Sequence, residues 1–253
     1  MSSMRKPSRP ILPFASRLLR GTALVVLILL FIAGAAFLPV EYESASMWYK
    51  SGTDRYLLLG GKILGLIAAC LVLLQLVWTA RLKSLDRIFG LNNLYIVHSL
   101  LALVICALVV IHPLCVQLSD DMLLIPLQMR YLPEFAGLLT AIMVLGLALG
   151  AIFRIQLGLP FHWWWRLHRS IAAIVPFALF FHILYVSETF QSGIPRQLAG
   201  GSLGAYLIVY AWVKTKSLRI RRSPLTVTDV QPAGEQATCI RLKPAPRKSS
   251  RQD

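Results

Sequence analysis

The stretch IFGLNNLYIVHSLLALVICALVVIHPLCVQLS, residues 88–119, is the longest run in the chain without a charged residue. About 20 helical residues, rising about 1.5 Å each, cross the roughly 30 Å of hydrocarbon in a bilayer. The run is therefore long enough to form one membrane-spanning helix. It also holds two histidines, His98 and His112. Ionisable residues are costly to place in lipid, so they point to a function.

Five other uncharged segments are long enough to span a membrane with their flanking residues. We predict an all-α membrane protein with six transmembrane helices, at residues 21–40, 63–80, 88–119, 135–153, 170–187 and 197–213. The last is the shortest, with 17 residues. The first could instead be a signal peptide, because a basic segment precedes it. Its apolar run is longer than a signal peptide needs, and we interpret it as an uncleaved span.

The composition agrees with a membrane protein. Of the 253 residues, 57% are hydrophobic and 15% are charged, which excludes a disordered chain and an ordinary soluble domain. The formal net charge of +15 would by itself allow nucleic acid or anionic lipid as a partner. The basic residues, however, gather in alternate connections between the predicted spans. The positive-inside rule then predicts a multi-pass protein of the plasma (bacterial inner) membrane with both termini in the cytoplasm, and no nucleic-acid partner.

Four of the five histidines form two pairs with the same spacing: His98 and His112 in the third predicted span, and His168 and His182 in the fifth. The spacing of 14 residues makes almost a whole number of turns. Both histidines of a span therefore face the same way, about 21 Å apart along the helix. The third and fifth spans run in the same direction. His98 is thus expected at the depth of His168, and His112 at the depth of His182.

Imidazoles at equal depth on two neighbouring parallel helices can take both axial positions of a haem iron, so the pattern predicts two b-type haems stacked across the membrane. A lone intramembrane histidine is more often a helix-to-helix hydrogen bond or part of a proton relay, but neither needs a repeated interval. A zinc or copper site would need its ligands within about 2 Å of one metal, which the separation forbids. The fifth histidine, His162, lies outside the pattern, beside an expected interfacial belt of Trp163, Trp164 and Trp165.

Two arginines flank His168 in the sequence. Arg166 and Arg169 are candidate partners for the propionates of the inner haem, and positive-inside anchoring explains them equally well. Close contact between helices is predicted at Gly34, Gly65, Gly146 and Gly150.

After residue 222 the pattern changes from long apolar runs to alternation. The segment PLTVTDVQPAGEQATCIRLKP predicts two strands, at residues 225–230 and 237–242, followed by a disordered tail at residues 245–253. A lone hairpin is barely stable in water, so it looks like the opening of a β-domain. The four cysteines, with no CxxC motif, indicate neither a disulfide framework nor a zinc site.

Residues 55–215 resemble the ferric reductase-like transmembrane domain, the cytochrome b module of NADPH oxidases and ferric-chelate reductases. The resemblance rests on LDRIFGLNNLYIVHSLLALVICALVVIHP (85–113) and WWWRLHRSIAAIVPFALFFH (163–182), where the histidines stand as the two bis-His pairs of that family do. It implies an inner haem on His98 and His168 and an outer haem on His112 and His182. Electrons would pass from a cytoplasmic flavin and NAD(P)H module through both haems to an acceptor on the outer face.

Complete members of the family continue into a flavin-binding barrel and a nucleotide-binding domain. Here only something like the first two strands of the barrel is present, with neither an Arg-Pro-aromatic-Ser/Thr flavin motif nor a glycine-rich nucleotide loop. The spans, the charges and the resemblance together predict three regions: a basic cytoplasmic segment (1–20), the six-helix ferric reductase-like domain (21–215), and a cytoplasmic tail that resembles the start of the barrel (216–253). FAD and NAD(P)H would bind only through a missing domain or a partner.

Three functions remain open on the sequence. The leading one is a dihaem cytochrome b, the membrane part of a ferric reductase-like or NAD(P)H oxidase-like oxidoreductase that is not complete alone. In the second, the chain is a cytochrome b subunit that docks a separate flavoprotein reductase and passes electrons to a periplasmic protein. In the third, the histidines carry protons in a transporter, which the few carboxylates inside the spans disfavour. The outer connection at residues 115–135 is expected to cover the outer haem, and the acceptor is a ferric chelate, oxygen or a protein.

Overall fold

The computed structural model describes residues 14–80, 82–120, 125–221, 225–232 and 238–244. The predicted tail at 245–253 and most of the predicted basic segment lie outside these residues. The chain divides into two compact units, Met1–Leu203 and Gly204–Asp253. In chain order the elements are α1 (Phe14–Glu41), α2 (Ala45–Trp48), α3 (Gly52–Thr79), α4 (Lys83–Phe89), α5 (Leu91–Ser119), the 3-10 helix η1 (Met129–Tyr131), α6 (Leu132–Ile152), α7 (Phe161–Val186), the 3-10 helix η2 (Glu188–Phe190), α8 (Gly193–Arg221), β1 (Leu225–Pro232) and β2 (Thr238–Pro244).

Five helices in the described part of the chain are long and apolar enough to cross a membrane: α1, α3, α5, α7, and α6 together with η1. They confirm the all-α membrane class and the first five predicted spans. The predicted number of six is not exact. α8 is a helix of 29 residues, but Gly200, Gly201 and Ser202 dilute its apolar stretch, and Lys214 and Lys216 follow it closely.

The surfaces of these helices call for apolar surroundings. Leu19, Leu27 and Leu30 of α1 are 72%, 62% and 63% exposed. Only 6% of the most apolar part of α1 or α6 is buried within the protein, against 33% for α3. Transfer of such a surface from water to hydrocarbon is favoured by about 25 cal/mol per Å². α3 is thus the most enclosed of the five helices, and the others present most of their apolar surface to lipid.

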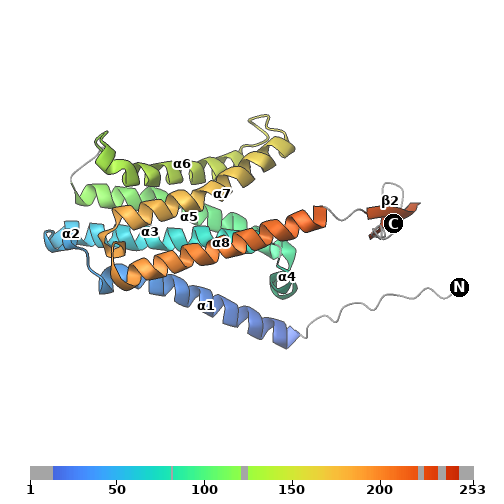
Figure 1. Cartoon of the computed structure of the whole chain (residues 1–253), viewed down its shortest axis with the longest axis horizontal. Coiled ribbons are helices and arrows are strands. Elements are labelled where there is room, and N and C mark those ends of the chain that lie inside the picture. The colour runs from blue at the N-terminus through green and yellow to red at the C-terminus, as the bar shows by residue number, and fades with distance from the viewer. Residues whose placement is uncertain (1–13, 81, 121–124, 222–224, 233–237, 245–253) are drawn as a thin grey trace, which may run out of the picture. The chain divides into compact units, whose positions relative to one another are not determined.

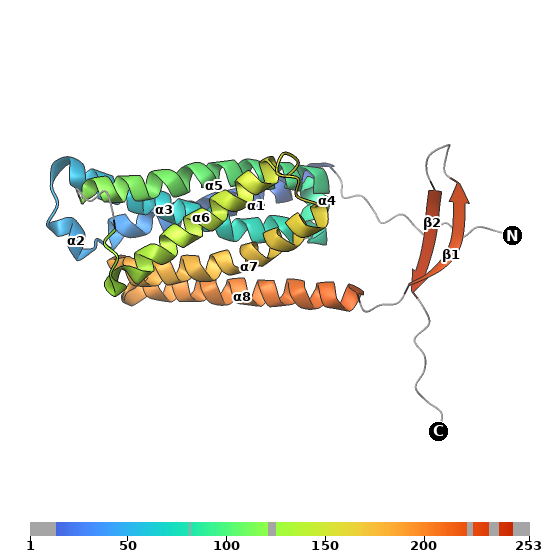
Figure 2. The same ribbon diagram turned by 90° about the horizontal axis from the view of Figure 1, so that it is seen from above.

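The helices of the first unit run side by side, with α2 at one end and α4 at the other (Figures 1 and 2). α3 packs along α5, and α6 packs along α7, so the unit contains two close helix pairs. α1 lies against α3. The two helices that carry the paired histidines, α5 and α7, therefore belong to different pairs.

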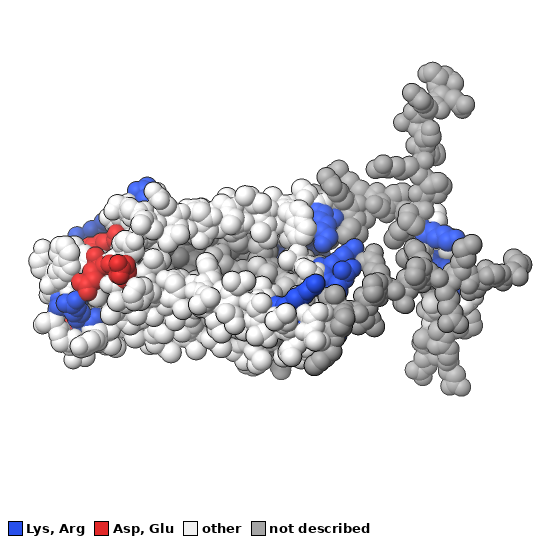
Figure 3. All heavy atoms as spheres, turned by 90° about the horizontal axis from the view of Figure 1, so that it is seen from below, with Lys and Arg blue, Asp and Glu red and all other residues white. Residues whose placement is uncertain are grey.

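The two ends of the first unit differ in charge. Figure 3 shows Asp and Glu beside Lys and Arg at the end that carries α2, and Lys and Arg at the end that carries α4. The connections and helix ends at the α2 end supply both signs: Glu41, Glu43, Asp54, Asp120, Glu134 and Glu188 with Lys50, Arg55, Arg130 and Arg196. Those at the α4 end are mainly basic: Lys83, Arg87, Arg154, Arg166 and Arg169 with Asp86.

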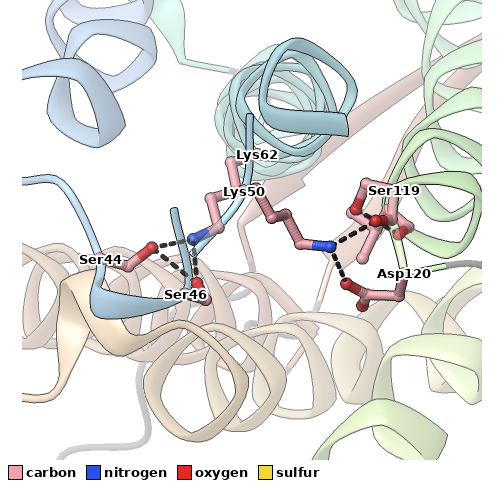
Figure 4. A network of polar contacts seen from close by, with 7 residues as sticks. Ser44, Ser46, Lys50, Lys62, Ser119 and Asp120 are labelled. Carbon is pink, nitrogen blue, oxygen red and sulfur yellow. Dashed lines mark hydrogen bonds and ion pairs between the residues drawn. The ribbon is translucent and has the colours of Figure 1, made fainter. Parts of the chain in front are cut away.

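Hydrogen bonds and ion pairs tie the connections together at the α2 end (Figure 4). Lys50 Nζ lies 2.7 Å from Asp120 Oδ1, which joins the segment before α3 to the end of α5. Lys62, inside α3, reaches back to the segment around α2. The further contacts are Lys50 to the Ser119 carbonyl, Lys62 to the Ser44 and Ser46 hydroxyls, and the Ser46 amide to Glu188 Oε2 at 2.9 Å.

Apolar contacts hold α4 at the opposite end. Leu85, 6% exposed, packs with Trp78 and Leu94, and the Trp78 ring meets the Phe89 ring edge-on with 6.1 Å between centroids. Gly90 follows α4 with φ +79, a conformation that side chains with a Cβ rarely adopt. This glycine lets the chain turn directly from α4 into α5.

The second unit contains the hairpin predicted from the sequence. β1 and β2 pair antiparallel, with Val230 opposite Ile240, and the register shifts between Val227 and Asp229. Val230 and Ile240 are 57% and 56% exposed. The predicted two-stranded sheet is confirmed, and these two apolar side chains are exposed.

Leu85→Ala should lower the free energy of unfolding by about 2 to 5 kcal/mol, because it removes a buried side chain and leaves a cavity beside Trp78. Thermal unfolding in detergent micelles measures the change. Leu91→Ala, at a leucine that is 43% exposed, is the matched control and should cost less than about 1 kcal/mol. Equal destabilisation by both substitutions would contradict the packing role of α4.

Candidate functional site

The four paired histidines meet in twos between α5 and α7. His98 of α5 and His168 of α7 have ring centroids 6.4 Å apart and ring planes at 70°. His112 of α5 and His182 of α7 have centroids 6.2 Å apart and planes at 79°. The structure thus brings together the histidines of equal predicted depth. We name His98 and His168 the α4-end pair, and His112 and His182 the α2-end pair.

Each pair has the spacing that one metal between two imidazoles requires. A metal–nitrogen bond of about 2 Å, with the further distance from that nitrogen to the ring centre, places two opposed ring centres about 6 Å apart. Two opposed imidazoles are an axial ligand set for haem iron, whereas a bare zinc ion takes four ligands. Among the residues that the structure describes, no cluster of three or more His, Cys, Asp or Glu could hold a metal ion. The donor set therefore fits haem better than a bare ion.

Backbone carbonyls orient both rings of the α2-end pair. His112 Nδ1 lies 2.7 Å from the Gly61 carbonyl oxygen of α3, and His182 Nδ1 lies 2.9 Å from the Pro133 carbonyl oxygen of α6. A carbonyl oxygen can only accept, so each Nδ1 carries the proton and donates it. The other ring nitrogen, Nε2, then keeps its lone pair in both rings and is the atom available to a metal.

Glycines leave room for these two rings. Gly65 lies one helical turn beyond the carbonyl acceptor in α3, and a Cβ placed there would lie 2.8 Å from the His112 ring. Gly137 lies one turn beyond the acceptor in α6, and a Cβ there would lie 2.5 Å from the His182 ring. Both distances are too short for carbon atoms in a packed interior. In each case a carbonyl oxygen accepts the hydrogen bond of the ring, and a glycine four residues later leaves space for the ring.

The α4-end pair has different surroundings. Gln75 of α3 donates from Nε2 to the His98 carbonyl oxygen at 3.2 Å, and its Oε1 is hydrogen-bonded to His98 Nδ1. His168 Nδ1 is buried and has no hydrogen-bond partner among the described residues. The Trp164 ring stands edge-on to the His168 ring with 5.3 Å between centroids. The indole fills the space beside Gly150, where a Cβ would lie 2.5 Å from it.

A cavity of about 410 Å³ adjoins the α2-end pair. Both rings of this pair line it, as do Gly65 and Gly137. A cofactor held between His112 and His182 would therefore have space beside the rings. The charged side chains of the lining, besides the two histidines, are Lys62, Asp120, Glu134 and Glu188. The connection predicted to cover the outer haem, residues 115–135, contributes six residues to the lining: Val116, Gln117, Asp120, Ile125, Tyr131 and Glu134.

The two arginines predicted as propionate partners lie against tryptophan rings. The Arg166 guanidinium carbon is 4.2 Å from the centroid of the Trp163 ring, and that of Arg169 is 5.6 Å from the centroid of the Trp165 ring. Trp163 and Trp165 are 59% and 47% exposed, as residues of an interfacial belt are.

The belt prediction is wrong for Trp164, which is 9% exposed. One helical turn separates Trp164 from His168, so both side chains lie on the same face of α7 and turn inward together. His162 is exposed, with its ring 6.0 Å from that of Trp163. It is not among the histidines that the structure brings together.

The sequence predicted the histidines but not the groups that orient them. The carbonyls of Gly61 and Pro133 leave no signal in residue type, because every residue has a carbonyl. Gln75 does leave one, since it is the only amide in the apolar run ILGLIAACLVLLQLVWTA. The predicted close helix contacts are confirmed at Gly65 and Gly150. The same prediction is wrong at Gly34 and Gly146, because a Cβ placed there would meet nothing within 4 Å.

Comparison with known proteins agrees with this geometry. Residues 64–179 match the family model described as the ferric reductase like transmembrane component. The matched range includes Gln75, Gly137 and the first three paired histidines, and it ends three residues before His182. Searches of curated proteins and of solved structures gave no match. Over residues 64–179 the chain therefore matches a ferric reductase-like transmembrane domain.

Proposed function

We propose that the chain conducts electrons across the membrane as the cytochrome b part of a ferric reductase-like oxidoreductase, with one b-type haem held by each histidine pair. The observation that carries this proposal is the spacing of the rings, 6.4 Å and 6.2 Å between centroids in two separate pairs. Haem iron supplies one-electron chemistry when it is bound between two such ligands.

The residues of the pairs define what the site can do. The Nε2 atoms of His98 and His168, and those of His112 and His182, would hold the haem irons, which would transfer electrons without binding a substrate. The acceptor must then be bound by protein groups near the cofactor edge and not by the iron. The α2 end offers Lys62, Glu134 and Glu188 in the cavity lining for that purpose.

We assign the α4 end to the cytoplasm, because its connections carry Lys83, Arg87 and Arg154 and cytoplasmic connections are enriched in Lys and Arg. A flavin- and NAD(P)H-binding module, in a further domain or a partner flavoprotein, is the donor at this end. The acceptor at the α2 end is a ferric chelate, oxygen or a periplasmic protein. In the last case the chain acts as an electron-transfer subunit and not as the site of reduction.

The purified protein should hold two haems per chain and show a reducible b-type difference spectrum. Substitution of both members of one pair, His98→Ala with His168→Ala or His112→Ala with His182→Ala, should leave one haem per chain, because each pair is a separate site. His162→Ala is the control and should keep both. Two haems in either double variant, or none in the wild-type protein, would refute the proposal.

Gly137→Ala should weaken haem binding at the α2-end pair by about 10- to 100-fold, the usual cost of disturbing the group that orients a metal ligand. The added methyl would press on the His182 ring and displace it from the Pro133 carbonyl. Gly146→Ala in the same helix has open space around its new methyl and should bind haem as the wild type does. Haem titration of the stripped protein, followed by absorbance, compares the two variants.

The direction of insertion can be tested with a membrane-impermeant maleimide on intact cells. Ser51 and Lys83 are both exposed, one just before α3 and one at the start of α4. With the native cysteines replaced by serine, Ser51→Cys should be labelled from outside and Lys83→Cys only after the membrane is broken. The opposite labelling would reverse the assignment of the two ends.

A further inference from the structure

The two histidine pairs differ in the hydrogen bonds of their rings. In the α2-end pair, both Nδ1 atoms reach a backbone carbonyl, at 2.7 Å and 2.9 Å. In the α4-end pair, one Nδ1 reaches a side-chain amide and the other, on His168, has no partner among the described residues. Gln75 is thus the acceptor that the structure shows for this pair.

The orientation of the Gln75 amide follows from its two contacts. The His98 carbonyl oxygen can only accept, so the amide nitrogen of Gln75 must face it. The amide oxygen must then face His98 Nδ1, which donates to it. The Gln75 side chain is therefore hydrogen-bonded to both the backbone and the ring of His98. These bonds hold the ring in the tautomer that has its proton on Nδ1 and its lone pair on Nε2.

We propose that Gln75 is a positioning residue that also sets the reduction potential at the α4-end pair, by serving as the hydrogen-bond acceptor for His98. The inference rests on the proposed haem ligation by this pair and adds a named residue and a direction. An acceptor at Nδ1 increases the electron density that Nε2 donates, which favours the ferric over the ferrous state. Gln75 thus lowers the reduction potential of iron held by His98 and His168.

The direction matters because most charges at this end act the opposite way, Asp86 being the one carboxylate there among the described residues. Positive side chains favour the ferrous state, which carries one positive charge less, and the α4 end carries Lys83, Arg87, Arg166 and Arg169. Without Gln75, a haem in the α4-end pair would have a higher reduction potential and would give up its electron less readily. Gln75 therefore keeps this end able to give an electron to the α2-end pair.

The test is a spectroelectrochemical titration of the two haems in the full-length protein. Gln75→Met has a similar shape and no strong acceptor, and it should raise one of the two midpoint potentials and leave the other unchanged. Gln75→Glu supplies a stronger acceptor as a carboxylate and should lower the same potential. The His112→Ala, His182→Ala background, which keeps only the α4-end pair, should show both shifts in its single remaining transition.

Thr79→Val is the matched control. Thr79 lies one turn from Gln75 in α3, and its hydroxyl donates to the main-chain carbonyl of Gln75 at 2.8 Å, not to the side-chain amide. This substitution should leave both potentials unchanged. If Gln75→Met loses one haem and Gln75→Glu keeps two, the positioning role is supported. Unchanged potentials in both Gln75 variants, or loss of the same haem in both, would overturn the inference. Wild-type protein without two reducible haems would instead refute the proposed function on which it rests.

Discussion

An imidazole inside a helix bundle has two nitrogens to satisfy, and three of the four paired rings here find a partner for Nδ1 on a neighbouring helix. Burial of a polar group without a hydrogen bond costs about 1 to 3 kcal/mol. The Nδ1 atoms of His98, His112 and His182 meet this requirement through α3 and α6, helices that carry no histidine. These hydrogen bonds join the same helices that pack closely, α3 on α5 and α6 on α7. The haem ligation that we propose would use the Nε2 atoms, which lie between the two helix pairs.

The equal intervals of His98 to His112 and of His168 to His182 were enough to predict which rings meet. The reason is that a helix has a fixed period, so a spacing of 14 residues defines both a face and a depth. The spans could be predicted for a similar reason, since hydrocarbon thickness sets a minimum length. The sixth predicted span, in α8, is not among the helices that are apolar enough to cross a membrane. Glycines interrupt its apolar run, and lysines follow it closely.

Apart from Gly65, Gly150 and the signal of Gln75, the rest of the site could not be predicted, because it depends on which helix lies beside which. The role of Gly137 requires the His182 ring to rest on α6, and nothing in the sequence near Gly137 indicates that ring. Gly146 has the same residue type in the same helix, yet open space surrounds it. Trp164 was assigned to the membrane interface with its two neighbours, but the helical period turns it toward His168. For these residues the type alone gave no position, which only the packing of the helices shows.

The acceptors of the two pairs differ in how they can change over evolutionary time. At the α2 end the acceptors are backbone carbonyls, which no point mutation removes, so variation there is confined to the small residues that admit the rings. At the α4 end the acceptor is a side chain, and a single nucleotide change in the codon of Gln75 can replace it. The acceptors at the α2 end are consequently resistant to genetic drift, while the acceptor at the α4 end is open to replacement.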